Sequence, residues 1–124
     1  MLMNKLYHII SFETDIAEGI LKAVISLDRN HPVFEGHFPG NPILPGVCTV
    51  QICKEILEKA TDKELMLIKS GNIKYLGFVN PAVHTEMQFN LAYKTGETGG
   101  YICSCSVSSG GNTVCSYKGE YLIL

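Results

Sequence analysis

His37 is the side chain best placed for acid–base chemistry, because it lies in a loop of unusual composition. Between residues 30 and 46 the 124-residue chain carries four of its five prolines, and three glycines are interleaved with them. The histidine side chain has an unperturbed pKa of about 6.5, so its neutral imidazole is abundant near neutral pH and can still accept a proton. Prolines and glycines at this density hold a backbone in special conformations, as a site requires. A purely structural turn is the alternative on these cues alone.

A helix is predicted directly after this loop. From Val47 to Leu57 apolar residues recur at three- and four-residue spacings, which predicts a helix over about residues 46–60. Pro45 lies near its start, where a missing amide proton costs nothing. Within the loop itself, the proline density predicts neither helix nor central strand.

Strand patterns dominate the rest of the chain. Residues 101–108 alternate between apolar and serine positions, which indicates a sheet with one buried face. One helix and many strands predict an α+β domain, in which an antiparallel sheet wraps around one long central α-helix. The predicted strands are 5–12, 19–27, 65–78, 85–94, 101–109 and 113–124, of which 19–27 is also compatible with a short helix.

Composition excludes several classes of protein. The net charge is −2 and there is no cluster of basic residues, which argues against a nucleic-acid binder. No stretch approaches the roughly 20 apolar residues of a membrane span, and the N-terminus lacks a signal-peptide core, so we expect a cytoplasmic location. Five cysteines in spacings unlike those of zinc or redox motifs are expected to be free, buried thiols.

The loop also carries a family resemblance. The string GHFPGNPILPGV, residues 36–47, resembles the active-site segment of the bacterial 3-hydroxyacyl-acyl-carrier-protein dehydratases of the FabA/FabZ type. The order of strands, loop and helix extends the similarity coarsely over residues 1–124. The resemblance implies a single hotdog-fold domain and no metal or organic cofactor. It also implies an acyl carrier protein as partner and a homodimer or higher homo-oligomer.

The resemblance assigns roles to individual residues. His37 is the base that removes the α-proton of the acyl thioester. The backbone amide of Gly46, with the positive end of the helix, stabilises the enolate-like oxygen. The carbonyl of Ile43 orients the imidazole. The residues expected to shape the mouth of the acyl tunnel are Phe38, Pro39, Gly40, Ile43, Pro45 and Val47, with Phe34 lining or supporting it.

One position departs from the family pattern. The family's catalytic acid lies on the helix fourteen positions after the histidine, where this chain has Gln51. An amide has no titratable proton to give to a leaving hydroxyl, although it can hydrogen-bond it. Three explanations remain open: Glu55, one helical turn later, contacts the substrate and supplies the acid; Gln51 and water share the role; or a homologous partner completes the site. The ordinary interpretation of Glu55 is a solvated carboxylate, or one paired with Lys59.

The expected activity is therefore dehydration of a (3R)-3-hydroxyacyl thioester on acyl carrier protein to the trans-2-enoyl product, in fatty-acid or related lipid biosynthesis. One alternative is a catalytically weak or silent hotdog subunit that binds acyl chains, or that completes the site of an active partner in a hetero-oligomer. A second alternative is a hotdog acyl thioesterase, against which the loop motif argues.

Overall fold

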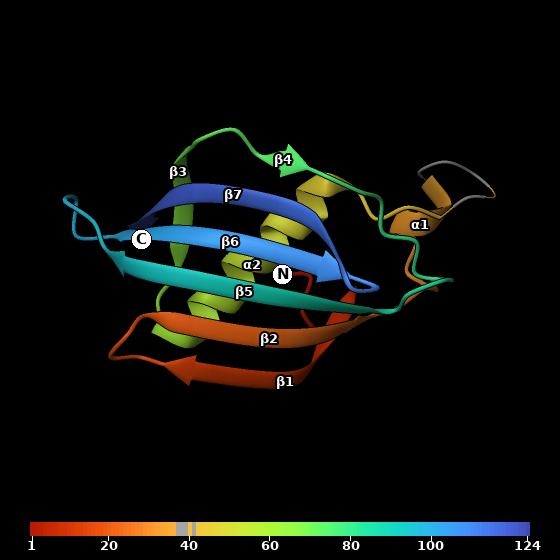
Figure 1. Ribbon diagram of the computed structural model, residues 1–124, viewed down its shortest axis with the longest axis horizontal. Coiled ribbons are helices and arrows are strands. Elements are labelled where there is room, and N and C mark those ends of the chain that lie inside the picture. Colours follow the sequence, from red (N-terminus) through yellow and green to blue (C-terminus); the bar gives the residue numbers. More distant parts are fainter. Residues whose placement is uncertain (37–39, 41) are drawn as a thin grey trace.

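The strands form one antiparallel sheet that curves around a helix (Figure 1). The computed structural model describes residues 1–36, 40 and 42–124. The strands run in the order β1-β2-β5-β6-β7-β3, and β4 also pairs with β7. Their bounds are β1 Tyr7–Asp15, β2 Ile20–Leu27, β3 Leu65–Ser70, β4 Lys74–Tyr75, β5 Glu86–Thr95, β6 Tyr101–Ser109 and β7 Asn112–Ile123; the helices are α1 Val33–Gly36 and α2 Gly46–Thr61. This confirms the predicted α+β hotdog architecture.

Helix α2 forms where the apolar spacing predicts it. Its buried face includes Ile52, Cys53 and the adjacent Ile56 and Leu57. The helix ends at Asp62, whose left-handed backbone lets its amide donate to the carbonyl of Glu58 at 2.8 Å. Because most of the buried residues of α2 are apolar, Thr49 and Glu55 apart, the helix is held mainly by packing against the sheet.

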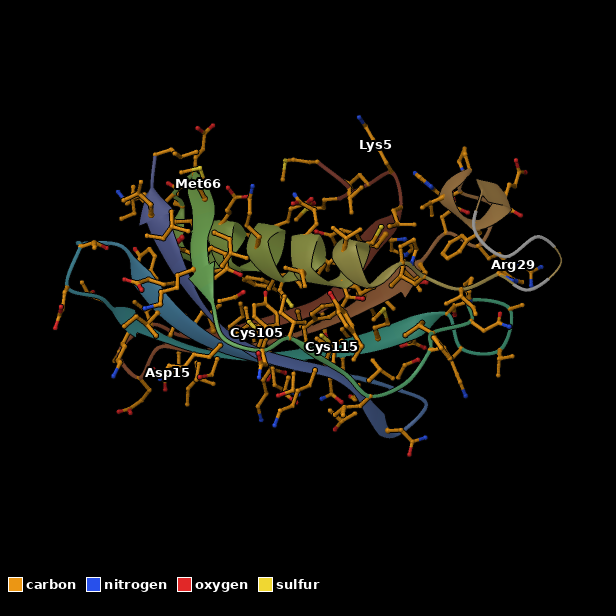
Figure 2. All side chains as sticks on the ribbon, turned by 90° about the horizontal axis from the view of Figure 1, so that it is seen from above. Lys5, Asp15, Arg29, Met66, Cys105 and Cys115 are labelled. Atoms are coloured by element: carbon orange, nitrogen blue, oxygen red, sulfur yellow. The ribbon has the colours of Figure 1, made fainter. Side chains whose placement is uncertain are left out.

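The alternation in β6 places its small apolar side chains beneath α2. Cys103, Cys105 and Val107 are buried, whereas Ser104 and Ser106 are exposed on the outer face. Figure 2 shows the layer of side chains between α2 and the sheet. All five cysteines are free thiols, as expected; four of them are buried, whereas Cys48 is half-buried. None of the described helices has the length and apolar character needed to cross a membrane.

Two local predictions differ from the structure. The proline-rich loop was predicted to lack helix, and this is wrong for α1, because Pro32 precedes its first residue and needs no amide donor there. The Nδ1 atom of His31 accepts a hydrogen bond from the amide of Val33 at 3.0 Å and caps this turn. The predicted strand over 65–78 is divided into β3 and β4 by residues 71–73.

Candidate active site

An apolar pocket of about 590 Å³ opens at the N-terminal end of α2. The end of the proline-rich loop forms one wall, and the segment that follows β4 forms the other. Phe78, in that second wall, is 81% exposed, which is unusual for so large an apolar side chain. The lining residues are Ile43, Leu44, Pro45, Gly46, Val47, Thr49, Tyr75, Leu76, Gly77, Phe78, Val79, Val114 and Cys115. The pocket therefore combines an apolar lining with the positive end of a helix.

Buried side chains fix the loop just before the motif and near the end of the motif. Phe34 and Leu44 are both buried in the core. The amide of Leu44 also donates to the carbonyl of Val79 at 2.9 Å, which ties the loop to the opposite wall of the pocket. The predicted site residues His37, Phe38 and Pro39 lie outside the described residues.

Gly46 begins α2 beneath an aromatic ring. A Cβ atom at this position would come within 2.4 Å of the Tyr75 ring, so only glycine fits while the ring stays in place. Pro45 precedes it, and no side chain caps this end of the helix in the described part of the chain. The start of α2 thus borders the pocket directly, as a contact between its amides and a thioester oxygen would require.

We predict that Gly46→Ala lowers activity about 10- to 10²-fold, because the new methyl group displaces the Tyr75 ring and shifts any substrate bound there. Steady-state rates with a 3-hydroxyacyl thioester measure the loss. Gly71→Ala is the matched control, since a Cβ at Gly71 meets nothing within 4 Å. Activity equal to that of the Gly71 variant would contradict a close approach of substrate to Gly46.

Gln51 lies on α2 in contact with a buried carboxylate. Its Nε2 atom donates to Oε2 of Glu55 at 2.8 Å. Gln51 lines a polar hollow with Met1, Lys54 and Leu65, separate from the apolar pocket at Gly46. Within one chain, the structure therefore does not bring Gln51 together with the start of α2.

The Glu55 carboxylate is enclosed by hydrogen-bond donors and is 1% exposed. Oε1 accepts from the amide of Leu2 at 3.0 Å, the amide of Met3 at 2.8 Å and the Tyr7 hydroxyl at 3.0 Å. Oε2 accepts a second contact from the Leu2 amide at 2.9 Å. The expectation of a solvated carboxylate, or one paired with Lys59, is wrong, because the N-terminal segment covers this side of α2 (Figure 2).

These contacts keep Glu55 ionised. Burial raises the pKa of its carboxyl, but the hydrogen bonds from Leu2, Gln51, Met3 and Tyr7 outweigh burial and hold that pKa below its ordinary value. Burial and the adjacent carboxylate raise the pKa of Tyr7, so its hydroxyl remains a donor. A carboxyl in this setting resists protonation, so the structure argues against Glu55 as the acid that replaces Gln51.

We predict a matching pH dependence of stability. Because the folded pKa is depressed, the contribution of Glu55 is complete above the unfolded pKa of about 4.3 and is lost as the pH falls through the lower folded pKa. Chemical unfolding at several pH values should show Glu55→Gln less stable than wild type by roughly 1–3 kcal/mol at pH 7. The gap should close in acid, and a gap independent of pH would contradict the account.

Comparisons with known proteins identify the family. The sequence model of the ApeI-like family, described as ApeI dehydratase, matches residues 13–116. The chain belongs to this family. The dehydratase FabZ of Klebsiella pneumoniae, a 3-hydroxyacyl-[acyl-carrier-protein] dehydratase, is 35% identical over 69 residues, which are 55% of this chain and 46% of the relative. This member of the ApeI-like family thus spans about half the length of the curated relatives it matches.

Solved structures support the same fold. A chain of the dehydratase heterocomplex ApeI:P from Xenorhabdus doucetiae superposes with a TM-score of 0.76 at 17% identity, covering 91% of this chain and 95% of the other. A hypothetical thioesterase with coenzyme A from Streptococcus pneumoniae superposes with a TM-score of 0.66 at 12% identity, covering 95% and 85%. At these identities the likeness concerns the fold alone. The family and these neighbours confirm the predicted resemblance to hotdog dehydratases.

The structure places the predicted residues in two groups. Gly46, Ile43, Pro45 and Val47 line the apolar pocket, whereas Gln51 and Glu55 form the hydrogen-bonded pair further along α2. Gly40 has a positive φ of 81°, a backbone conformation that favours glycine. Among the residues that the structure describes, no group of three or more His, Cys, Asp or Glu side chains is arranged to hold a metal ion.

Sequence reasoning missed the second wall of the pocket and the partners of Glu55. Tyr75 and Phe78 reach the helix start only through the pairing of β4 with β7. Leu2 and Met3 contact Glu55 through backbone amides, which no side-chain pattern reveals. In the sequence, the available signal for this wall was the pair of aromatic residues on either side of Gly77, and such a pair is equally typical of a strand.

Proposed function

We propose that this protein dehydrates a (3R)-3-hydroxyacyl thioester, carried on acyl carrier protein, to the trans-2-enoyl thioester. The observation that carries the proposal is the apolar pocket that opens onto the start of α2 at Gly46. An acyl chain fits its lining, and a thioester oxygen fits its helix end. Membership in the ApeI-like dehydratase family supports the same reaction.

The proposed mechanism uses His37 as the base. The imidazole takes the α-proton, and the electron pair of the C–H bond moves toward the thioester carbonyl. The Gly46 amide stabilises the negative charge that develops on the carbonyl oxygen. The electrons then form the Cα–Cβ double bond as the C–O bond breaks, and the hydroxyl leaves as water after taking up a proton. Gln51 has no such proton to give, so we assign that step to a water molecule, which regains a proton from the His37 imidazolium and thereby restores the neutral base.

We propose that two copies of the fold share each site. Gln51 does not line the pocket at Gly46 of its own chain. Strand β3 lies at an edge of the sheet, and Met66 and Ile68 on it are 46% and 44% exposed. An exposed apolar edge strand is a template for pairing with another chain. Pairing there gives a homodimer, in which the helix of one copy can serve the pocket of the other.

A second candidate is a subunit that depends on a homologous partner. The observation that favours it is the amide at position 51, where the resemblance to the FabA/FabZ-type dehydratases implies an acid. One of the solved structures with this fold is the dehydratase heterocomplex ApeI:P from Xenorhabdus doucetiae, so a hetero-oligomer is known for a protein of this fold. In such a pair, His37 of this chain would work with the partner's carboxylate.

Product identity tests the proposal. The purified protein is incubated with a 3-hydroxyacyl carrier protein, and the thioester is followed by mass spectrometry. Dehydration removes one water and leaves the thioester intact, whereas a thioesterase releases the free acid. The control substrate is the same carrier protein with an acyl chain of equal length that lacks the β-hydroxyl. We expect only the loss of water from the hydroxylated substrate; release of acid from both substrates would overturn the proposal in favour of a thioesterase.

A further inference from the structure

The pair formed by Gln51 and Glu55 has a defined orientation. A carboxylate has acceptors only, so the atom of the Gln51 amide that lies 2.8 Å from Oε2 must be the nitrogen. The carbonyl oxygen of the same amide therefore points away from Glu55, because the two atoms lie on opposite sides of the amide carbon. Glu55 thereby decides which atom of Gln51 is offered to its surroundings.

Glu55 is itself held from the other side. The amides of Leu2 and Met3 and the hydroxyl of Tyr7 lie within 3.0 Å of its carboxylate. Such a fully satisfied buried carboxylate is rigid, since rotating it breaks several charge-assisted hydrogen bonds at once. The N-terminal segment thus fixes Glu55, and Glu55 in turn fixes Gln51.

We propose that Glu55 is a positioning residue, which holds the Gln51 amide so that its carbonyl oxygen accepts a hydrogen bond from the β-hydroxyl of a substrate in the pocket of the second copy. This inference rests on the proposed dehydratase function. It explains how a chain without the family's acid at position 51 can still hold the hydroxyl in a single orientation. A freely rotating amide would present nitrogen and oxygen with similar ease.

The first test reads the orientation without any reaction. The side-chain amide protons of Gln51 are assigned in NMR spectra by their disappearance in Gln51→Leu. Gln88 is exposed on β5 and serves as the control in the same spectrum. We expect one Gln51 amide proton to exchange with water at least about tenfold more slowly than those of Gln88. Equal exchange rates at the two side chains would overturn the proposal.

The second test uses a double-mutant cycle. Glu55→Gln removes the fixed orientation, and we expect kcat to fall about 5- to 10-fold with KM changed less than about 3-fold. Gln51→Glu with Glu55→Gln exchanges donor and acceptor, which restores an oriented pair, and should recover the loss. In the double variant, the new carboxyl at position 51 no longer faces a like charge at position 55, so it loses its proton at lower pH. The rate of the double variant should therefore begin to fall at a lower pH than the rate of Gln51→Glu alone.

The outcomes separate the two proposals. Additive effects of the two substitutions, with the same pH profile in both backgrounds, would show that Glu55 acts only on stability and would overturn the inference. Slow exchange at Gln51 without turnover by wild type or by Gln51→Glu would support the fixed orientation while overturning the proposed function.

Discussion

Replacement of His37 by alanine is expected to lower the rate of dehydration by about 10² to 10⁴-fold, the usual contribution of a positioned general base. The wild-type rate should rise with pH as the imidazole loses its proton and becomes able to accept the α-proton. The variant should lose this acid limb together with its activity. Rates measured across pH 5 to 9 with a 3-hydroxyacyl carrier protein provide the comparison.

His31→Ala is the matched control for that substitution. His31 lies in the same loop, but its ring caps α1 by accepting from Val33, so its loss should affect stability more than rate. If His31→Ala and His37→Ala lowered the rate equally, the assignment of His37 as the general base would be contradicted. Unchanged circular dichroism of both variants confirms that each is folded.

Gln51→Glu is expected to raise the rate about 10- to 10²-fold, because it supplies the proton donor that the amide lacks. The Gln51 nitrogen lies 2.8 Å from Oε2 of Glu55, so the new carboxyl would meet an existing carboxylate. Two carboxylates this close cannot both ionise easily, and the pair retains a shared proton to higher pH than one carboxyl alone. The hydrogen bonds from Leu2, Met3 and Tyr7 remain in the variant and still lower the pKa of Glu55, so that proton resides mainly on the new side chain.

The pH profile distinguishes this gain from an indirect effect. The rate of the Gln51→Glu variant should rise with His37 deprotonation and fall again as the shared proton is lost, giving a bell shape. The rate of the wild-type protein should not fall at alkaline pH for this reason, because Gln51 and Glu55 share no proton. Gln88→Glu on the outer face of the sheet is the matched control and should change neither rate nor profile. A slower Gln51→Glu variant without an alkaline limb would contradict the role assigned to position 51.

Local patterns were sufficient for the elements that depend on local physics. Helix α2 follows from apolar spacing, and the faces of β6 follow from the alternation of cysteine and serine. The motif in residues 36–47 was sufficient to indicate the family. The resemblance placed Gly46 at the start of the helix, where the structure has it.

Features that depend on distant contacts could not be predicted in this way. Glu55 carries the spacing of an ordinary surface carboxylate, yet backbone amides more than fifty residues earlier bury it. Tyr75 reaches Gly46 because β4 turns back onto β7 after the break at residues 71–73. Both depend on where the sheet brings remote segments together, which periodicity within one segment does not encode.

Release of an isotopic label from the α-carbon tests the central claim most directly. A 3-hydroxyacyl carrier protein labelled with deuterium at the α-carbon is incubated with the purified protein alone, and both label release and enoyl formation are measured. We predict release by wild type at least as fast as enoyl formation, since removal of the α-proton does not require an acid at position 51, and none above background by His37→Ala. If the folded wild-type protein released no label from the α-carbon, or if the His37→Ala variant released it equally fast, the account would be contradicted.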